Sequence, residues 1–294
     1  MQIGLAGLGK MGAAIGTRLL NVGHALTVWN RSAAKAKPLA EVGATVAASP
    51  TELAQRAELV ITILTDAAAI DAVYGGPSGL LGGDIKGKLF IDMSTVQPAT
   101  PIALAEKVRS RGAAFVECPV GGTIGPAREG KLLGLMGAEP ADAERAKPIL
   151  QQLCRRIEYC GPVGAAATMK LAINLPLMVS WQAFGEAFAL CRDLGFKPQQ
   201  LLDLFTDISG TSNALKARAP MIVAMLEGRH EGPTTFDIDS ARKDLQTMLA
   251  AGKARGVELP LVERTLDCFD EASRNGWGLR DGSAVPVYWS KRGG

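Results

Sequence analysis

The sequence predicts an α/β protein with two domains: an N-terminal, doubly wound sheet domain and a C-terminal all-α domain, joined by a long helix. Three observations predict this fold. Short apolar runs alternate with helical patterns as far as residue 161. A glycine-rich turn follows the first apolar run, and only helical patterns remain beyond residue 162. A length of 294 residues also favours two domains over one.

The first apolar run, residues 3–6, leads into a GxGxxG sequence. In a Rossmann-like unit the first glycine makes the tight turn, the second lets backbone approach a pyrophosphate, and the third lets helix and strand pack closely. The helix that follows would offer its backbone N–H groups to phosphate. A second strand at 25–29 completes the unit, which favours a dinucleotide site over a turn without function. The predicted contacts are Gly7, Leu8, Gly9, Lys10, Met11 and Gly12.

The end of the second strand predicts which dinucleotide binds. An Asp or Glu usually holds the ribose of NAD at this point, whereas this chain has Asn30, Arg31 and Ser32. Asn30 and Ser32 can donate hydrogen bonds, and Arg31 can pair with a 2′-phosphate, with Lys35 as a possible second charge. We predict that NADP(H) is preferred and that NAD(H) is possible. The alternative is that Arg31 is only a solvated charge in a turn.

The rest of the first domain alternates in the same way. Further strands are expected at 43–46, 59–64, 89–92, 112–117, 132–137 and 156–159, with helices at 33–41 and from Pro50 onward. Ser49 can cap the second of these helices, in which Pro50 takes the first position. Ligands of such sheets bind at the carboxyl ends of the strands. We therefore expect Leu64 and Thr65 to contact the cofactor.

The second half predicts helices at 164–195, 198–207, 213–227, 237–256 and 259–275, with a kink at Pro176. We place the domain boundary between residues 161 and 162, giving a cofactor-binding domain 1–161 and a helical domain 162–294. A cleft is expected between them. Residues 165–192 carry many apolar side chains, which predicts at least a homodimer. Examples are Leu175, Leu177, Met178 and Phe184.

Composition narrows the class further. Hydrophobic residues make up 47% and charged residues 21%, which predicts a large core. A net charge of +3 without long basic runs argues against nucleic acid binding. Five scattered cysteines and only two histidines, His24 and His230, argue against a metal site or a disulfide framework. Neither a signal peptide nor a membrane span is recognisable, so we expect a cytoplasmic protein.

Lys170 and Asn174 lie four residues apart in an otherwise apolar segment, so they share one face of the predicted helix. Such a lysine can simply extend its amine to water at the edge of an apolar face. If Lys170 is partly buried, desolvation disfavours its ammonium form, and it could exchange protons near neutral pH. The spacing alone leaves both interpretations open.

Together these motifs resemble the β-hydroxyacid dehydrogenase family, which includes 3-hydroxyisobutyrate dehydrogenases and the NADPH-dependent glyoxylate, succinic semialdehyde and tartronate semialdehyde reductases. The resemblance runs from residue 3 to about residue 285. It rests on residues 4–12, 92–95, 119–123, 161–174 and 243–244.

The resemblance implies an enzyme that moves a hydride between NADP(H) and a small β-hydroxy acid or semialdehyde. Lys170 would be the catalytic general acid and base, with Asn174 beside it near the substrate. Thr95 would touch both cofactor and substrate, and Lys243 would close over the nicotinamide end. The substrate would be lined by Ser94, Thr95, Gly121, Gly122, Thr123, Lys170 and Asn174. The family also forms dimers or tetramers through its helical domain.

One position departs from the family pattern, which usually has Ser where this chain has Gly121. That hydroxyl commonly binds the substrate carboxylate, so the departure leaves the substrate open. The alternatives are an imine reductase-like enzyme, a decarboxylating relative of 6-phosphogluconate dehydrogenase and a non-catalytic NADP-binding module. Lys170 argues against the first and the last, because imine reductases usually replace this lysine and a non-catalytic module should have lost it.

Overall fold

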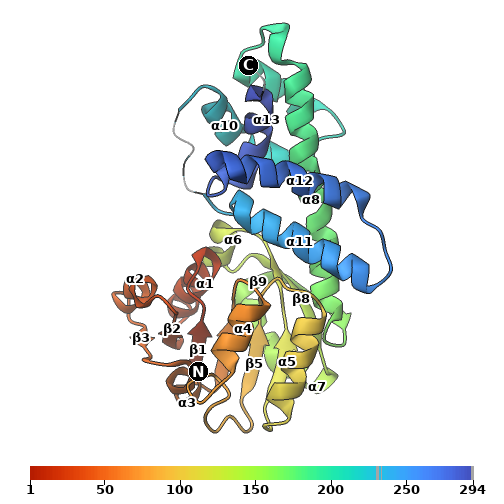
Figure 1. The fold of residues 1–294 in the computed structure, drawn as a ribbon. Coiled ribbons are helices and arrows are strands. Elements are labelled where there is room, and N and C mark those ends of the chain that lie inside the picture. Colours follow the sequence, from red (N-terminus) through yellow and green to blue (C-terminus); the bar gives the residue numbers. More distant parts are fainter. Residues whose placement is uncertain (230–231, 233, 293–294) are drawn as a thin grey trace. The chain divides into compact units, whose positions relative to one another are not determined.

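The computed structural model describes residues 1–229, 232 and 234–292. The chain separates into two compact units, Met1–Lys170 and Leu171–Gly294 (Figure 1). The boundary between 161 and 162 stays a prediction, as does a cleft between the domains. Of the two histidines, only His24 lies within the described residues.

The first unit is built on one sheet, all of whose strands lie in described residues (Figure 1). Six strands run parallel in the order β3-β2-β1-β4-β5-β6, so the order reverses at β1 and the predicted doubly wound fold is confirmed. Their bounds are Gln2–Ala6 for β1, Ala25–Trp29 for β2, Thr45–Val46 for β3, Leu59–Thr62 for β4, Leu89–Asp92 for β5 and Ala114–Glu117 for β6. β8 (Leu132–Ala138) continues the sheet antiparallel to β6, and β7 (Val120–Gly121) and β9 (Cys154–Gly161) pair with β8.

Helices cover both faces of this sheet. They are α1 (Lys10–Asn21), α2 (Lys37–Ala40), α3 (Pro50–Arg56), α4 (Ala67–Tyr74), α5 (Ala99–Arg109), α6 (Ile124–Glu129) and α7 (Pro140–Leu153). In β5, Leu89 and Ile91 join the core formed with α1, α2, α6 and α7, whereas Phe90 joins the core formed with α3, α4 and α5. Both faces are apolar because both are covered, which is why the strands read as unbroken apolar runs.

The ends of α3 follow the predicted chemistry. The Ser49 hydroxyl accepts a hydrogen bond from the Glu52 backbone N–H at 3.1 Å, and Pro50 occupies the first turn. At the other end, Lys88 Nζ donates to the carbonyls of Ala54 (2.7 Å) and Ala57 (2.6 Å). A cation there opposes the negative end of the helix dipole.

The single helix predicted at 33–41 is wrong. The segment forms a short 3₁₀ helix, Ala33–Ala36, followed by the one-turn α2. Pro38 lies in the first turn of α2, where its missing N–H costs no helical hydrogen bond, so α2 begins at this proline and does not continue the 3₁₀ segment.

Within its described residues, the named secondary-structure elements of the second unit are all helices, as predicted. The long helix α8 (Ala165–Leu190) begins in the first unit and continues through Pro176; the remaining helices are α9 (Pro198–Asp207), α10 (Asn213–Leu226), α11 (Ile238–Ala254), α12 (Pro260–Ala272) and α13 (Val285–Lys291). Their core includes Trp181, Phe188, Phe269 and Trp289. Within the described part of the chain, no helix has both the length and the apolar character needed to cross a membrane.

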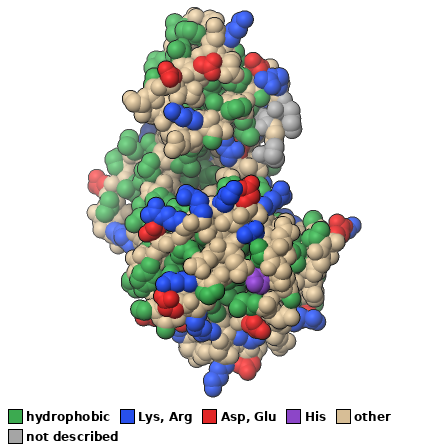
Figure 2. Space-filling view, turned by 180° about the vertical axis from the view of Figure 1, so that it is seen from behind, with side chains coloured by type: hydrophobic (Ala, Val, Ile, Leu, Met, Phe, Trp, Pro, Cys, Tyr) green, Lys and Arg blue, Asp and Glu red, His purple; other side chains and the backbone are tan. Residues whose placement is uncertain are grey.

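The apolar residues that suggested an oligomer are covered inside the second unit. Met178 and Phe184 are buried in its core, and Leu175 and Leu177 pack partly buried against it. Hydrophobic side chains reach the surface in both units on the face drawn in Figure 2. Large exposed ones in the segment 190–208 are Leu190, Leu194, Phe196, Leu204 and Ile208.

Candidate functional site

The glycine-rich turn joins β1 to α1, and its three glycines have different surroundings. Gly7 has φ +98°, and a Cβ there would run into the Ile63 carbonyl oxygen. A Cβ on Gly12 would run into the Gly7 carbonyl oxygen. A Cβ on Gly9, in contrast, would meet nothing within 4 Å. Positions 7 and 12 therefore require glycine for the fold, whereas Gly9 leaves an open cradle at the helix N-terminus.

The start of α1 suits an anion. Gly9 is its N-cap residue, so no side chain caps the helix, and its first turn contains no acidic residue. The first backbone N–H groups of a helix have no partner within the helix, and they carry a partial positive charge. The cradle beside Gly9 thus fits the phosphates of a dinucleotide.

Asn30 holds this turn in place from the end of β2. Its Oδ1 accepts a hydrogen bond from the Leu8 N–H at 2.9 Å, and its Nδ2 donates to the Ser32 carbonyl at 3.0 Å. Arg31 and Ser32 are exposed beside it. The three residues predicted to select the cofactor therefore lie next to the glycine-rich turn, and Asn30 also has a structural role that the sequence did not reveal.

A buried polar network lies at the carboxyl ends of β4 and β5. Asp92 Oδ1 accepts hydrogen bonds from the hydroxyls of Thr62 (2.6 Å) and Ser94 (2.8 Å). The Ser94 hydroxyl in turn accepts from the Leu64 N–H at 2.9 Å. Burial raises the pKa of Asp92 to about 6, although the two hydroxyls favour its ionised form. The network brings the predicted residues Leu64 and Ser94 together; Thr65 is exposed and Thr95 half-buried beside them.

Glu117 lies next to Asp92 in the sheet, since the two are register partners on β6 and β5. Its side chain is only 1% exposed. Glu117 Oε1 accepts hydrogen bonds from the N–H groups of Gly164 (2.6 Å) and Ala166 (2.9 Å), at the start of α8. Burial raises the pKa of Glu117 to about 7, the N–H donors oppose the rise, and the charge of Asp92 adds to it.

The predicted substrate segment 121–123 follows β6. A Cβ on Gly121 would lie in ordinary contact with Leu133, at 3.5 Å from its Cβ. Gly122 has φ +126°, and a Cβ there would be only 2.8 Å from Leu132 Cδ2. Position 121 therefore has room for a side chain, whereas position 122 requires glycine. The Thr123 hydroxyl does not cap α6, which begins after it.

In the second unit, Asp244 connects two predicted residues. Asn174 Nδ2 donates to Asp244 Oδ2 at 3.3 Å, and Lys243 Nζ lies 2.5 Å from Asp244 Oδ1. Asp244 is buried. Lys170, on the same helix as Asn174 and one turn before it, is 8% exposed. Sequence analysis named Lys243 as a predicted contact, but it did not predict that Asp244 binds both Lys243 and Asn174.

Sequence reasoning did not single out Asp92, Glu117 or Asp244 as site residues. The sequence does indicate that Asp92 and Glu117 are unusual, because each is a carboxylate at the end of an otherwise apolar strand. A buried charge at that place needs partners from neighbouring segments. Ser94 lies only two residues from Asp92, but Thr62 is 30 residues from Asp92, and the partners of Glu117 are 47 and 49 residues away.

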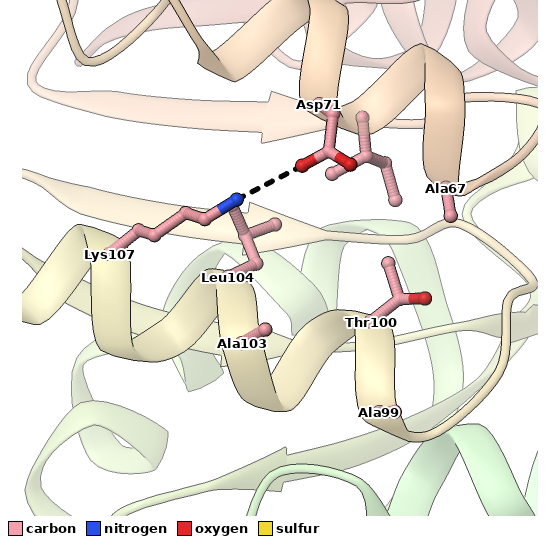
Figure 3. A pocket seen from close by; sticks show the side chains of 8 residues that line it. Ala67, Asp71, Ala99, Thr100, Ala103, Leu104 and Lys107 are labelled. Carbon is pink, nitrogen blue, oxygen red and sulfur yellow. Dashed lines mark hydrogen bonds and ion pairs between the residues drawn. The ribbon is translucent and has the colours of Figure 1, made fainter.

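A separate hollow of about 230 Å³ lies between α4 and α5 (Figure 3). Its walls include Ala67, Ile70, Ala103 and Leu104, and an ion pair between Lys107 Nζ and Asp71 Oδ1 spans it at 3.0 Å. None of the predicted site residues lines it. Among the described residues, no group of three His, Cys, Asp or Glu side chains is placed to hold a metal ion.

Two family models match consecutive parts of the chain. Residues 2–161 match the NAD binding domain of 6-phosphogluconate dehydrogenase, and residues 164–288 match the NAD-binding domain of NADP-dependent 3-hydroxyisobutyrate dehydrogenase. Together they extend over both units.

Similar proteins match over nearly the whole length. Glyoxylate/succinic semialdehyde reductase 1 of Arabidopsis thaliana is 34% identical over 285 residues, which is 97% of each chain. The structure of Mycobacterium tuberculosis 3-hydroxyisobutyrate dehydrogenase with L-serine is similar with a TM-score of 0.84, at 27% identity over 98% of both chains. A reductive aminase from Aspergillus terreus in complex with NADPH and ethyl levulinate is similar with a TM-score of 0.63 and 26% identity, over 98% of this chain and 99% of that one.

Proposed function

This chain belongs to the β-hydroxyacid dehydrogenase family, and we propose that it is an NADP(H)-dependent reductase or dehydrogenase of small β-hydroxy acids or semialdehydes. The observation that carries the proposal is the turn at residues 7–12. Two of its glycines are required by the backbone, and the third leaves an open cradle at a helix N-terminus. The whole-length similarity to a semialdehyde reductase supports the reaction type.

The residues present fit a nicotinamide dinucleotide. Backbone N–H groups at the start of α1 would hold the pyrophosphate, and Arg31 with Ser32 would hold a 2′-phosphate. The segment 30–32 contains no Asp or Glu that would repel a 2′-phosphate. This arrangement favours NADP(H) over NAD(H). Leu64, Thr65 and Thr95, at the ends of β4 and β5, and Lys243 of the second unit complete the proposed cofactor contacts.

Hydride transfer, proton transfer and substrate orientation would then fall to different groups. The nicotinamide ring, when bound, supplies or accepts the hydride. Lys170 would give a proton to the substrate oxygen during reduction and take one from it during oxidation. Asn174, on the same face of α8, would orient that oxygen, and Asp244 would hold Asn174 through the 3.3 Å contact.

The proposed substrate carries a carboxylate. The relative from Arabidopsis thaliana is named for glyoxylate and succinic semialdehyde, each of which combines an aldehyde with a carboxylate. In this chain, the backbone of Gly121 and Gly122 with the hydroxyls of Thr95 and Thr123 would receive that group. Ser94 would line the substrate beside them, with its own hydroxyl bound to Asp92. Position 121 offers space but no hydroxyl, so we expect weaker carboxylate binding than a serine would provide.

The experiment that tests the proposal is a substrate panel followed by NADPH absorbance. It should contain semialdehydes, 3-hydroxy acids and cyclic imines, each with NADP(H) and with NAD(H). Turnover of a semialdehyde or 3-hydroxy acid with NADP(H) is the expected result. Turnover of imines alone would favour an imine reductase, and tight NADPH binding without any turnover would favour a non-catalytic binding module.

We also propose that the protein forms a homodimer or homotetramer. Five large apolar side chains are exposed within the segment 190–208, and Leu190 is 85% exposed. Covering such side chains on a partner would lower the free energy of the assembly. Light scattering at micromolar concentration tests this, and a monomer would contradict it.

A further inference from the structure

We propose that Glu117 is a positioning residue for Lys170: its buried carboxylate fixes the first turn of α8 to the end of β6. The inference rests on the function proposed above, because it concerns the placement of the proton-transfer group. All of its residues lie within the first unit, Met1–Lys170.

The start of α8 depends on an acceptor from elsewhere in the chain. The residue before the helix is Gly164, which has no side chain that could cap it. Glu117 Oε1 supplies the missing acceptor, with N···O distances of 2.6 Å to Gly164 and 2.9 Å to Ala166. A carboxylate at this point also faces the positive end of the helix dipole. The cap therefore comes from β6 rather than from the helix itself.

The Glu117 side chain has little freedom to move away. It is 1% exposed. Its register partner on the next strand, β8, is Gly137, and a Cβ at that position would run into Glu117 Oε1. Gly164 is confined as well, because its φ is +100° and a Cβ there would lie 2.7 Å from Ile102 Cδ1. Positions 137 and 164 therefore require glycine for the carboxylate and the helix start to lie this close.

The anchor is one helical turn from Lys170. In an α-helix, the N–H of residue 170 bonds to the carbonyl of residue 166, so a displacement of Ala166 passes directly to Lys170. Glu117 is also followed within a few residues by the proposed substrate segment 121–123. One side chain therefore connects the segment that would hold the substrate with the helix that would move the proton. A misplacement of about 1 Å at such a group can cost about a hundredfold in rate.

The test uses Glu117→Ala and Glu117→Gln in the full-length protein, with Ser49→Ala as the control. Ser49 caps α3 in the same unit through a 3.1 Å bond to the Glu52 N–H, and α3 carries no proposed site residue. Three quantities are measured: hydrogen exchange of the segment 164–170, kcat and KM for the best substrate, and the NADPH dissociation constant.

For Glu117→Ala we expect faster exchange at 164–170 and a kcat about 10- to 100-fold lower, with the NADPH dissociation constant within about twofold of wild type. Glu117→Gln should restore both exchange and kcat to within a few-fold, because its amide oxygen can accept the same N–H groups. Ser49→Ala should speed exchange in α3 alone and leave kcat unchanged.

Three results would overturn the inference. They are unchanged exchange at 164–170 in Glu117→Ala, faster exchange there with wild-type kcat, or a Glu117→Gln variant that folds but loses as much kcat as the alanine variant. The last result keeps the test decisive if Glu117→Ala fails to fold. A wild-type protein that turns over nothing in the panel would contradict the proposed function instead, while the exchange data would still report on the anchor.

Discussion

Glu117 in the first unit and Asp281 in the second are both almost fully buried carboxylates, but they have different partners. Glu117 accepts two backbone N–H groups on Oε1, and its Oε2 has no hydrogen-bond partner. Asp281 accepts from Thr235 and Ser283 on its two oxygens, and Arg218 lies 3.8 Å away. Burial raises the pKa of Glu117 to about 7. Burial also acts to raise the pKa of Asp281, but its donors and Arg218 outweigh it and lower that pKa.

A second pair of acids also differs in the direction of its pKa shift, although Asp92 is buried and Asp239 is more exposed. Asp92 in the first unit has only hydroxyl donors, and burial raises its pKa to about 6. Asp239 in the second unit has a lowered pKa, through the Ser273 hydroxyl and Arg242. Asp281 and Asp239 in the second unit therefore each lie beside an arginine. Among the described residues, no lysine or arginine is paired with Asp92 or Glu117 at the carboxyl edge of the sheet in the first unit, where the candidate site lies. Uncompensated buried charge is a mark of functional sites.

The largest expected effect is the loss of kcat when Lys170 is replaced. It tests whether proton transfer depends on a residue of the first unit. Lys170→Ala should lower kcat about 10²- to 10⁴-fold, the usual contribution of a positioned acid or base. NADPH binding should survive, because its phosphates are proposed to bind at the glycine-rich turn, residues 7–12. Lys170→Arg should not rescue, since guanidinium stays protonated. Asn174→Ala should do less damage, by misplacing the substrate. Steady-state kinetics with the best substrate measure all three.

If Lys170→Ala kept near wild-type kcat, Lys170 would be only a structural lysine. Lys243, in the second unit, would then be the first candidate for the proton donor. That outcome would place the proton donor in the second unit, and the contrast between a catalytic first unit and a structural second unit would not hold.

The next largest effect concerns how the free energy of unfolding changes with pH. A carboxylate whose pKa is raised by folding contributes stability that is present below its unfolded pKa and is lost as pH rises through its folded pKa. For Glu117 the window runs from about 4.5 to about 7. Glu117→Gln removes this loss, so its unfolding free energy relative to wild type should rise by about 2–3 kcal/mol between pH 5 and pH 8. Urea unfolding at several pH values measures it.

Asp281→Asn is the matched variant in the second unit. Because the pKa of Asp281 is lowered, its contribution is present above the ordinary value of 3.8 and is lost only as pH falls below that. The variant should be destabilised by a similar amount at pH 5 and at pH 8. A pH slope of the same size in both variants would show that the two environments do not differ.

A smaller effect is expected on cofactor choice, a property assigned to the first unit alone. Arg31→Ala should reduce the preference for NADP(H) over NAD(H) about ten- to a hundredfold, since a charge-assisted contact is worth about 1.5–3 kcal/mol. Arg111→Ala removes another arginine of this unit, one that donates to the Gly83 carbonyl, and serves as control. The ratio of kcat/KM for the two cofactors is the measurement. Equal values in the wild type would contradict the NADP(H) assignment.

The smallest effect compares two adjacent glycines of the first unit. Gly121→Ser should fold normally, because its Cβ meets only ordinary contacts, and should lower KM for a carboxylate substrate a few-fold by adding a hydrogen-bond donor. Gly122→Ala should instead lower the melting temperature, since φ is +126° and Leu132 is close. A Gly121→Ser variant with a raised KM would show that the substrate needs the empty space.

The sequence predicted most of the first unit because its signals are local. Strands buried on both faces read as apolar runs, and the start of α3 is encoded by Ser49 and Pro50 themselves. The segment α13 was missed because Val, Pro, Tyr and Trp in seven residues give no helical periodicity. The roles of Asn30 and Glu117 were out of reach for a different reason. Their partners lie 22 residues away for Asn30 and 47 to 49 residues away for Glu117, so only the topology brings them together.

The cap that Glu117 places on α8 also decides where the chain can be divided. A fragment that ends at residue 161 would contain every strand of the sheet, yet it would lack the two N–H groups that Glu117 accepts. Its carboxylate would then be buried without any donor, or would have to open the sheet edge to water. A fragment that ends at Lys170 keeps both donors. We therefore expect a fragment that ends at Lys170 to be more stable than one that ends at residue 161.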